Sequence, residues 1–205
     1  MIPVLMLTAI MTSCEEEDKN TDPPANYNSE GVYIINEGGF MAGNASVSYL
    51  NLENMAMTGD IFQSVNGFPL GDVAQSMTIN NGKGYIIVNN SQKVEVVNLT
   101  DFTLQATVSG FSGPRYMAVW NNKGYVTDWF SDEVKVVDLG SNTIIKSIPA
   151  GTGPEHLCIA SNKVYVANIG GFTSDSTVTV INANTDSVQG RKMEYWDRIR
   201  LPGLC

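Results

Sequence analysis

Apolar residues recur along this chain with a period of 40 residues, and the repeat is clearest over residues 114–153. Matching residues return at this shift in four sets of positions: Met77, Met117 and Leu157; Ile79, Val119 and Ile159; Lys83, Lys123 and Lys163; and Tyr85, Tyr125 and Tyr165. A longer apolar run at 94–99 returns at 134–139. A fixed period of this length, built of short runs separated by turn residues, is typical of a propeller blade.

Each unit contains four short runs that favour strands. In residues 114–153 the runs lie at 116–120, 125–127, 134–139 and 144–148, with turn-forming residues between them. The third run starts with alternating apolar and polar residues and then becomes more continuously apolar, as a strand between two layers does. Four antiparallel strands cannot bury both faces alone, so each sheet needs a neighbour. The sequence therefore predicts an all-β fold, a β-propeller of four-stranded antiparallel blades.

The propeller is predicted to span residues 30–189, in repeats at about 31–72, 73–112, 113–152 and 153–189. The first repeat begins out of phase, because its three runs match the second, third and fourth strands of a blade: 31–36, 47–52 and 56–65. In closed propellers the missing innermost strand commonly comes from the other end of the chain. Residues 190–205 carry no blade pattern. We interpret the chain as the front portion of a longer propeller with an atypical tail; the alternative is a four-bladed ring closed by an unusual helix.

The chain opens with a pattern typical of export. Residues 2–11 are apolar apart from one Thr, and Cys14 follows shortly after. Residues 1–13 resemble a bacterial lipoprotein signal peptide, with Cys14 as the lipidated residue; the apolar stretch is too short to span a bilayer. The alternative is a frayed or buried N-terminal strand. Residues 14–29 are acidic and polar and predict a solvated tether, either a plain spacer or a signal for transfer to the cell exterior.

Composition narrows the function further. The chain has 12 basic and 21 acidic residues, a formal net charge of −9, and no basic stripe, which disfavours nucleic-acid binding. The three cysteines, Cys14, Cys158 and Cys205, do not suggest a disulfide framework. His156 is the single histidine and there is no Cys-x-x-Cys, so ligands for zinc or haem are lacking. We expect no metal and no resident cofactor.

The repeat also carries a family resemblance. Its order is Gly-Pro-x-x-apolar-x-apolar, then Asn-Lys-x-Tyr-Val, then Val-x-Val-apolar-Asp/Asn, as in residues 113–138. Over residues 31–188 this order resembles the YncE-like bacterial surface propellers, and most of all their seven-bladed surface lipoproteins. One branch of these lies over an outer-membrane transporter and captures cobalamin. The resemblance implies a lipid-anchored outer-membrane protein exposed at the cell surface, with cobalamin as a candidate ligand and a transporter as a candidate partner. Membrane contact would be through the N-terminal lipid alone.

Two sets of loops should meet on one rim of the blades. These are the loop before the first strand and the loop between the second and third strands. They carry the residues predicted to bind a ligand: Gln75, Arg115, Tyr116, Glu155 and His156 before the first strands, and Asn36, Phe40, Asp128, Trp129, Phe130, Asn168 and Phe172 between the second and third. Aromatic and amide side chains at one mouth suit a flat polar organic ligand or a protein surface. The alternative for the aromatic residues is packing between blades.

Two of these loops are longer than the others and share a motif. Both carry Asn-x-Gly-Gly-Phe, which ends at Phe40 in the first repeat and at Phe172 in the fourth. Extended glycine-rich loops with an aromatic residue on a rigid scaffold suit recognition, although the glycine pair would also simply let the chain turn.

Three functions compete at this point. The first is a surface lipoprotein that captures a small nutrient, and the second is a protein-docking or envelope-structural propeller. The third is a propeller hydrolase or dehydrogenase, in which His156 would be the base, oriented by Glu155 or Asp128. No serine or cysteine nucleophile motif and no second histidine accompany His156, so we favour a binding module. We also expect the isolated chain to self-associate, because its end blades should expose apolar faces.

Overall fold

The computed structural model describes residue 27, residues 30–189 and residues 193–194. The predicted signal peptide, Cys14 and nearly all of the tether and tail lie outside these residues.

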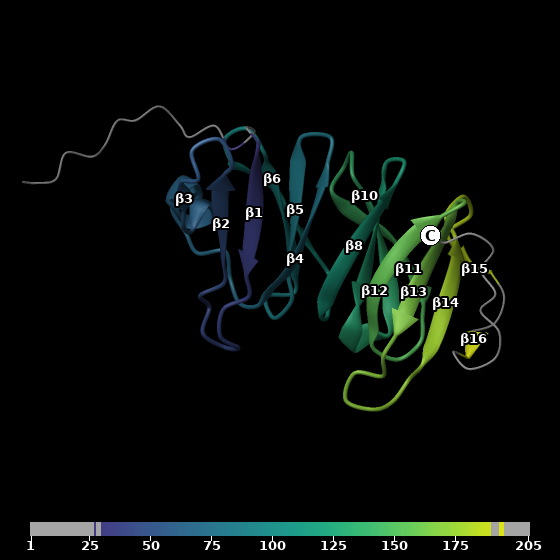
Figure 1. The fold of residues 1–205 in the computed structure, drawn as a ribbon. Coiled ribbons are helices and arrows are strands. Elements are labelled where there is room, and N and C mark those ends of the chain that lie inside the picture. The colour runs from purple at the N-terminus through teal and green to yellow at the C-terminus, as the bar shows by residue number, and fades with distance from the viewer. Residues whose placement is uncertain (1–26, 28–29, 190–192, 195–205) are drawn as a thin grey trace, which may run out of the picture.

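The described residues form four antiparallel sheets that stand side by side across the molecule (Figure 1). The first contains β1 (Gly31–Asn36), β2 (Ser46–Asn51) and β3 (Met57–Thr58). The second contains β4 (Ala74–Asn80), β5 (Lys83–Val88), β6 (Lys93–Asn98) and β7 (Leu104–Ser109). The third contains β8 (Pro114–Trp120), β9 (Lys123–Asp128), β10 (Glu133–Asp138) and β11 (Thr143–Pro149). The fourth contains β12 (Pro154–Ala160), β13 (Lys163–Asn168), β14 (Thr177–Asn182), β15 (Ser187–Val188) and β16 (Met193–Glu194). The predicted all-β architecture of propeller blades is confirmed.

The core consists of three apolar layers, one between each pair of neighbouring sheets. Of the repeated tyrosines, Tyr85 and Tyr125 lie in these layers and are both almost fully buried. The Tyr125 hydroxyl donates 3.0 Å to the carbonyl oxygen of Ala183 in the next sheet and 2.5 Å to the Asp186 carboxylate. The Tyr33 hydroxyl of the first sheet donates at 2.5 Å to the carbonyl oxygen of Tyr27, and the carbonyl oxygen of Leu99 in the second sheet lies 3.4 Å away. At Tyr125 the ring packs between two sheets while the hydroxyl contacts the next sheet.

The predicted fourth strand of the first sheet, residues 56–65, is wrong for most of its length. Strand pairing ends after β3, and α1 (Ile61–Asn66) follows. The Asp60 side chain accepts a hydrogen bond from the Gln63 N–H at the helix start, and Gly67 ends the helix in a left-handed conformation. Ile61 and Phe62 are fully buried in the first apolar layer. A helix can bury these two side chains as a strand would, and the caps at Asp60 and Gly67 favour the helix.

The predicted tail contributes one short strand to the fourth sheet. β15 pairs with β14 through Ile181 and Val188, and β16 pairs with β14 through Thr177 and Glu194. Sequence patterning missed this pairing because two-residue strands have no measurable period.

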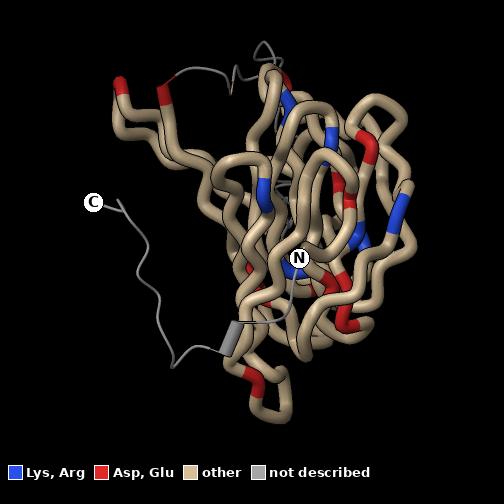
Figure 2. The backbone as a smooth tube through the Cα atoms, turned by 90° about the vertical axis from the view of Figure 1, so that its right-hand side faces the viewer, with Lys and Arg blue, Asp and Glu red and all other residues tan. Residues whose placement is uncertain are grey.

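Charged residues are dispersed over the fold. Figure 2 shows short Lys and Arg segments that alternate with Asp and Glu segments along the described backbone, without a continuous basic band. The described residues also contain no helix with the length and apolarity needed to cross a bilayer.

Candidate functional site

The innermost strand of each complete sheet begins with a β-bulge. The pairing register shifts between Ala74 and Ser76 in β4, between Pro114 and Met117 in β8, and between Pro154 and Leu157 in β12. The residues within these bulges are the ones predicted from the loops before the first strands: Gln75, Arg115, Tyr116, Glu155 and His156. Bulges turn side chains away from the regular alternation of a strand. Here they direct one polar group per sheet toward the neighbouring sheet.

Arg115 and Glu155 form an ion pair between the third and fourth sheets. The Arg115 Nε donates 3.0 Å to Glu155 Oε2, and one terminal nitrogen donates 2.8 Å to Oε1. The side chains are only 17% and 9% exposed. The Arg115 guanidinium also lies 5.0 Å from the centre of the Trp129 ring, within the range of a cation–π interaction. The ion pair is therefore bidentate, which fixes its geometry, and it lies beside an aromatic ring.

A second chain of contacts crosses three sheets. The Gln75 side-chain amide donates 3.0 Å to the Tyr116 hydroxyl. The Tyr116 ring stacks on His156, with centres 3.8 Å apart and 28° between the planes. The Gln75 Oε1 is buried and has no hydrogen-bond partner among the described residues. A ligand or water with a free donor would satisfy this oxygen.

Trp129, Phe130 and Phe172 form an aromatic cluster at the same rim. Trp129 and Phe130 belong to the short 3-10 turn after β9 (Trp129–Ser131), and Phe172 to the β13–β14 loop. The Trp129 centre lies 5.7 Å from Phe130 and 5.5 Å from Phe172, and the two Phe rings are within 17° of parallel. Phe130 is 60% exposed and Phe172 is 88% exposed. These rings border a pocket of about 200 Å³.

Glycines allow the two loops to approach each other at this pocket. Gly153 has a φ of +58°, and a methyl group there would lie 2.4 Å from the Gly171 nitrogen and 2.7 Å from Trp129 Nε1. The Gly170 N–H donates 2.8 Å to the Thr152 carbonyl oxygen, and the Ile169 N–H donates 3.1 Å to the Gly153 carbonyl oxygen. The β13–β14 loop is therefore attached to the loop before β12 by its backbone, which places Phe172 beside Trp129.

Three predicted residues have polar groups already used by the fold. Asp128 is fully buried, and its carboxylate accepts hydrogen bonds from the Ser112 and Gly113 N–H groups. Asn168, at the equivalent position of the next repeat, is 2% exposed and accepts from the Gly151 N–H. The Asn36 amide donates to the hydroxyls of two serines on β2. The Asp128 and Asn168 side chains therefore position the rim loops, and the Asn36 amide nitrogen is engaged with β2.

The two Gly-Gly-Phe loops differ in their surroundings. Both extend from the lower end of the sheets in Figure 1, and Phe40 is 72% exposed. Among the described residues, no aromatic ring pairs with Phe40, whereas Phe172 has two aromatic neighbours. The structure therefore brings Phe172 into the site and leaves Phe40 apart.

Sequence reasoning missed three polar residues that border the aromatic pocket: Asp132, Thr152 and Thr173. The Asp132 Oδ1 accepts from the Gly153 N–H at 2.9 Å, and Asp132 has a φ of +53°. The equivalent residue of the previous repeat, Gln92, also has a positive φ of 56°. The repeat position therefore marks a tight turn, but no pattern in the sequence indicates that the Asp132 side chain borders a pocket.

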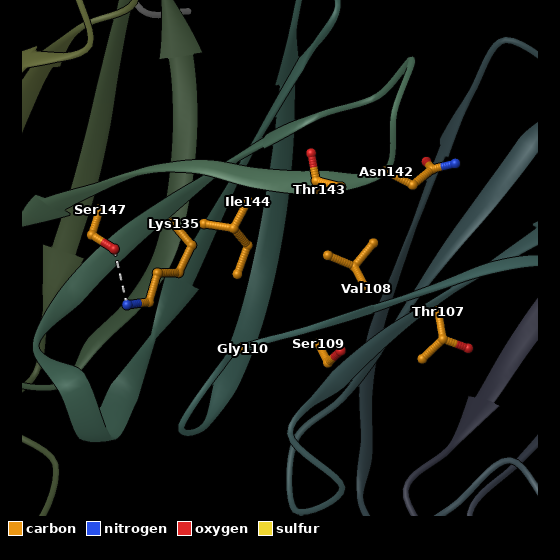
Figure 3. A pocket seen from close by; sticks show the side chains of 9 residues that line it. All are labelled: Thr107, Val108, Ser109, Gly110, Lys135, Asn142, Thr143, Ile144 and Ser147. Carbon is orange, nitrogen blue, oxygen red and sulfur yellow. Dashed lines mark hydrogen bonds between the residues drawn. The ribbon is translucent and has the colours of Figure 1, made fainter.

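A larger pocket of about 390 Å³ lies between β7 and β11, where the outer strands of neighbouring sheets diverge (Figure 3). Hydroxyl-bearing side chains line it together with Val108, Ile144 and Lys135. The Lys135 ammonium donates to Ser147 Oγ at 3.0 Å and also pairs with Glu133. The charged group of this pocket is already paired, although the buried Asn142 Oδ1 has no partner among the described residues. This pocket lacks the exposed aromatic rings of the rim.

The described residues contain no group of three or more His, Cys, Asp or Glu side chains arranged to hold a metal ion.

Comparisons with known proteins agree with the fold. The family model described as "Domain of unknown function (DUF5074)" matches residues 30–195. No curated protein matches the chain significantly. Among solved structures, hydrazine synthase from Kuenenia stuttgartiensis is similar with a TM-score of 0.67 and 16% identity, over 89% of this chain and 53% of that chain. Dihydro-heme d1 dehydrogenase NirN is similar with a TM-score of 0.55 and 12% identity, over 78% and 38% of the chains. AztD from Citrobacter koseri is similar with a TM-score of 0.50 and 15% identity, over 71% and 41%. The chain thus spans about half, or less, of the length of these structures, and at these identities the likeness concerns the propeller fold alone.

Proposed function

The chain belongs to the DUF5074 family, and we propose that it is the binding module of a lipoprotein, which captures a small organic ligand at the rim formed by the third and fourth sheets. The observation that carries this proposal is the exposed aromatic cluster Trp129, Phe130 and Phe172 beside the Arg115–Glu155 ion pair.

The exposure of these rings is costly for the free protein. Burying one Phe side chain contributes roughly 1.5–3 kcal/mol, and both Phe130 and Phe172 are mostly exposed. The glycine-rich loop that carries Phe172 is fixed by backbone hydrogen bonds to the loop before β12, so the ring is presented on a preformed support. Preorganised apolar groups beside a few polar ones are the usual composition of a ligand site.

The polar groups at the rim support binding more than catalysis. Glu155 is engaged with Arg115, and Asp128 with two backbone N–H groups. Neither carboxylate is therefore available to orient His156 as a general base. His156 itself stacks on Tyr116. A hydrolase or dehydrogenase would need groups that these contacts already occupy.

The proposal extends to a location and a partner, both suggested by the sequence and its family resemblance. Lipidation of Cys14 would anchor the chain to the outer membrane, and the acidic tether would carry it to the cell surface. A propeller there would hand its ligand to an outer-membrane transporter, and the family resemblance makes cobalamin the first probe to test.

The test is cyanocobalamin binding to the full chain, measured by isothermal titration calorimetry and by quenching of tryptophan fluorescence, followed by a thermal-shift panel of nutrient-sized molecules. The matched variants are Phe172→Ala and Phe40→Ala, which remove the same ring from the same motif in two surroundings. We expect a bound probe to lose affinity in Phe172→Ala and to keep it in Phe40→Ala. The proposal is wrong if no small molecule binds, or if Phe172→Ala leaves the affinity for every bound molecule unchanged.

Protein docking is a second candidate, because the exposed rings project outward beside an arginine. Trp, Phe and Arg are enriched at the centres of protein interfaces. In that case Phe172→Ala would weaken association with the transporter's outer face, measured by biolayer interferometry, and the small-molecule panel would give no binding.

A further inference from the structure

The aromatic pocket is too small for a whole large ligand. Its volume of about 200 Å³ lies below the roughly 300–1,000 Å³ of sites that enclose drug-sized molecules. A single ring-sized group would fill it, and the rest of a larger ligand would lie along the rim.

The polar groups of the pocket include both a donor and acceptors without partners. The Trp129 Nε1 is buried and makes no hydrogen bond among the described residues, and an indole N–H can only donate. Asp132 uses one carboxylate oxygen for the Gly153 N–H, and its other oxygen has no partner among the described residues. The Thr173 hydroxyl donates 2.7 Å to the Gly170 carbonyl oxygen, which leaves its lone pairs to accept. A ligand with hydroxyl groups matches this set, because hydroxyls donate to Asp132 and Thr173 and accept from an indole N–H such as that of Trp129, which lies against Gly153 and Gly171.

We propose that this pocket takes one pyranose ring of a carbohydrate, an inference that rests on the proposed role of the rim as a ligand site. Sugar hydroxyls both donate and accept, which matches the indole N–H of Trp129 and the carboxylate of Asp132. The C–H groups on one face of a pyranose carry partial positive charge, and the faces of Phe130 and Phe172 are negative. The exposed, nearly parallel rings give that face an apolar support.

An organic cation is the competing ligand class, because aromatic clusters with a nearby carboxylate also bind ammonium groups. Two observations disfavour it. A quaternary ammonium offers no acceptor to Trp129 Nε1, which would stay buried and unpaired. The Arg115 guanidinium already lies 5.0 Å from the Trp129 ring centre, so a cation is already in place on this indole.

The experiment measures binding of three probe classes to the full chain by calorimetry and tryptophan fluorescence. The saccharides are maltotetraose, cellotetraose and mannotetraose; the cations are choline and tetramethylammonium; cyanocobalamin is the third class. We expect at least one saccharide to bind. Phe172→Ala should weaken it about tenfold through lost ring burial, and Asp132→Asn should weaken it similarly through a lost charge-assisted hydrogen bond. Phe40→Ala, in the matching loop outside the pocket, should bind as the wild type does.

The outcomes separate the two proposals. Binding of cobalamin or choline without any saccharide, sensitive to Phe172, overturns the carbohydrate assignment and leaves the rim as a ligand site. If a saccharide binds with the same affinity to Phe172→Ala and Asp132→Asn as to the wild type, the sugar lies elsewhere and the assignment is overturned as well. No binding by any probe class removes both proposals.

Discussion

Replacing Asp128 tests whether one buried carboxylate holds the rim loops in place. Asp128 is fully buried, and it accepts hydrogen bonds from the Ser112 N–H at 3.0 Å and the Gly113 N–H at 2.5 Å. Asp128→Ala leaves the buried Gly113 N–H and the half-buried Ser112 N–H without a partner, and an unpaired buried donor costs roughly 1–3 kcal/mol. We expect a loss of about 4 kcal/mol in the free energy of unfolding, a large part of the roughly 5–15 kcal/mol of a typical domain.

The chain itself supplies the control for this experiment. The equivalent position of the next repeat is Asn168, whose Oδ1 accepts from the Gly151 N–H at 3.1 Å. Asp128→Asn retains an acceptor oxygen and should lose only about 1 kcal/mol. Urea denaturation followed by tryptophan fluorescence would measure both variants, with the urea dependence unchanged if the unfolded state is unaffected. Equal stability of the Ala and Asn variants would show that the carboxylate does not hold the loop.

Three further results are expected from the same structure. Glu155→Gln should destabilise the fold by about 3 kcal/mol in urea denaturation, because the mostly buried Arg115 guanidinium then lacks its counter-charge. An unchanged urea midpoint would contradict this. Burial raises the pKa of Tyr33 to about 12, whereas an unfolded tyrosine ionises near pH 10, so stability present below pH 10 should fall as the pH rises from 10 to 12. Tyr33→Phe should flatten that fall in urea melts at increasing pH, and identical slopes would refute the assignment. Gly153→Ala should cost roughly 1–3 kcal/mol in thermal unfolding because of its positive φ and crowded surroundings, whereas Gly59→Ala, with open space around it, should be nearly neutral.

The repeat and the strands were predictable because each strand has its own local pattern. The period of 40 residues and the positions of Tyr85 and Tyr125 depend on short-range alternation and on packing that every sheet repeats. α1 escaped prediction because residues 56–65 are apolar enough for a strand, and only the cap residues Asp60 and Gly67 distinguish the two structures. In this segment the helix caps outweigh the strand pattern of the repeat, and the chain forms a helix.

The site was only half predictable for a different reason. Arg115 and Glu155 were identified from the loops before the inner strands, but their mutual contact depends on bulges in β8 and β12. The meeting of Trp129 and Phe172 depends on two loops held together by backbone hydrogen bonds and a positive φ at Gly153. Such contacts join residues about one repeat apart through irregular backbone, and no sequence period encodes them.

The polar side chains at the rim fall into two groups, those already hydrogen-bonded within the fold and those with a buried atom that has no partner among the described residues. The Asp128 and Asn168 side chains lie next to the aromatic cluster in sequence or in space, yet their oxygens are paired with backbone donors. Gln75 Oε1 and Trp129 Nε1 are buried at the same rim and have no partners among the described residues. A fold that pairs its supporting groups while it leaves these two unpaired bears a cost that binding can offset. Asp72, Trp120 and Asn142 also carry a buried side-chain atom without a partner among the described residues. What distinguishes the rim is that its unpaired Trp129 lies beside the exposed rings of Phe130 and Phe172.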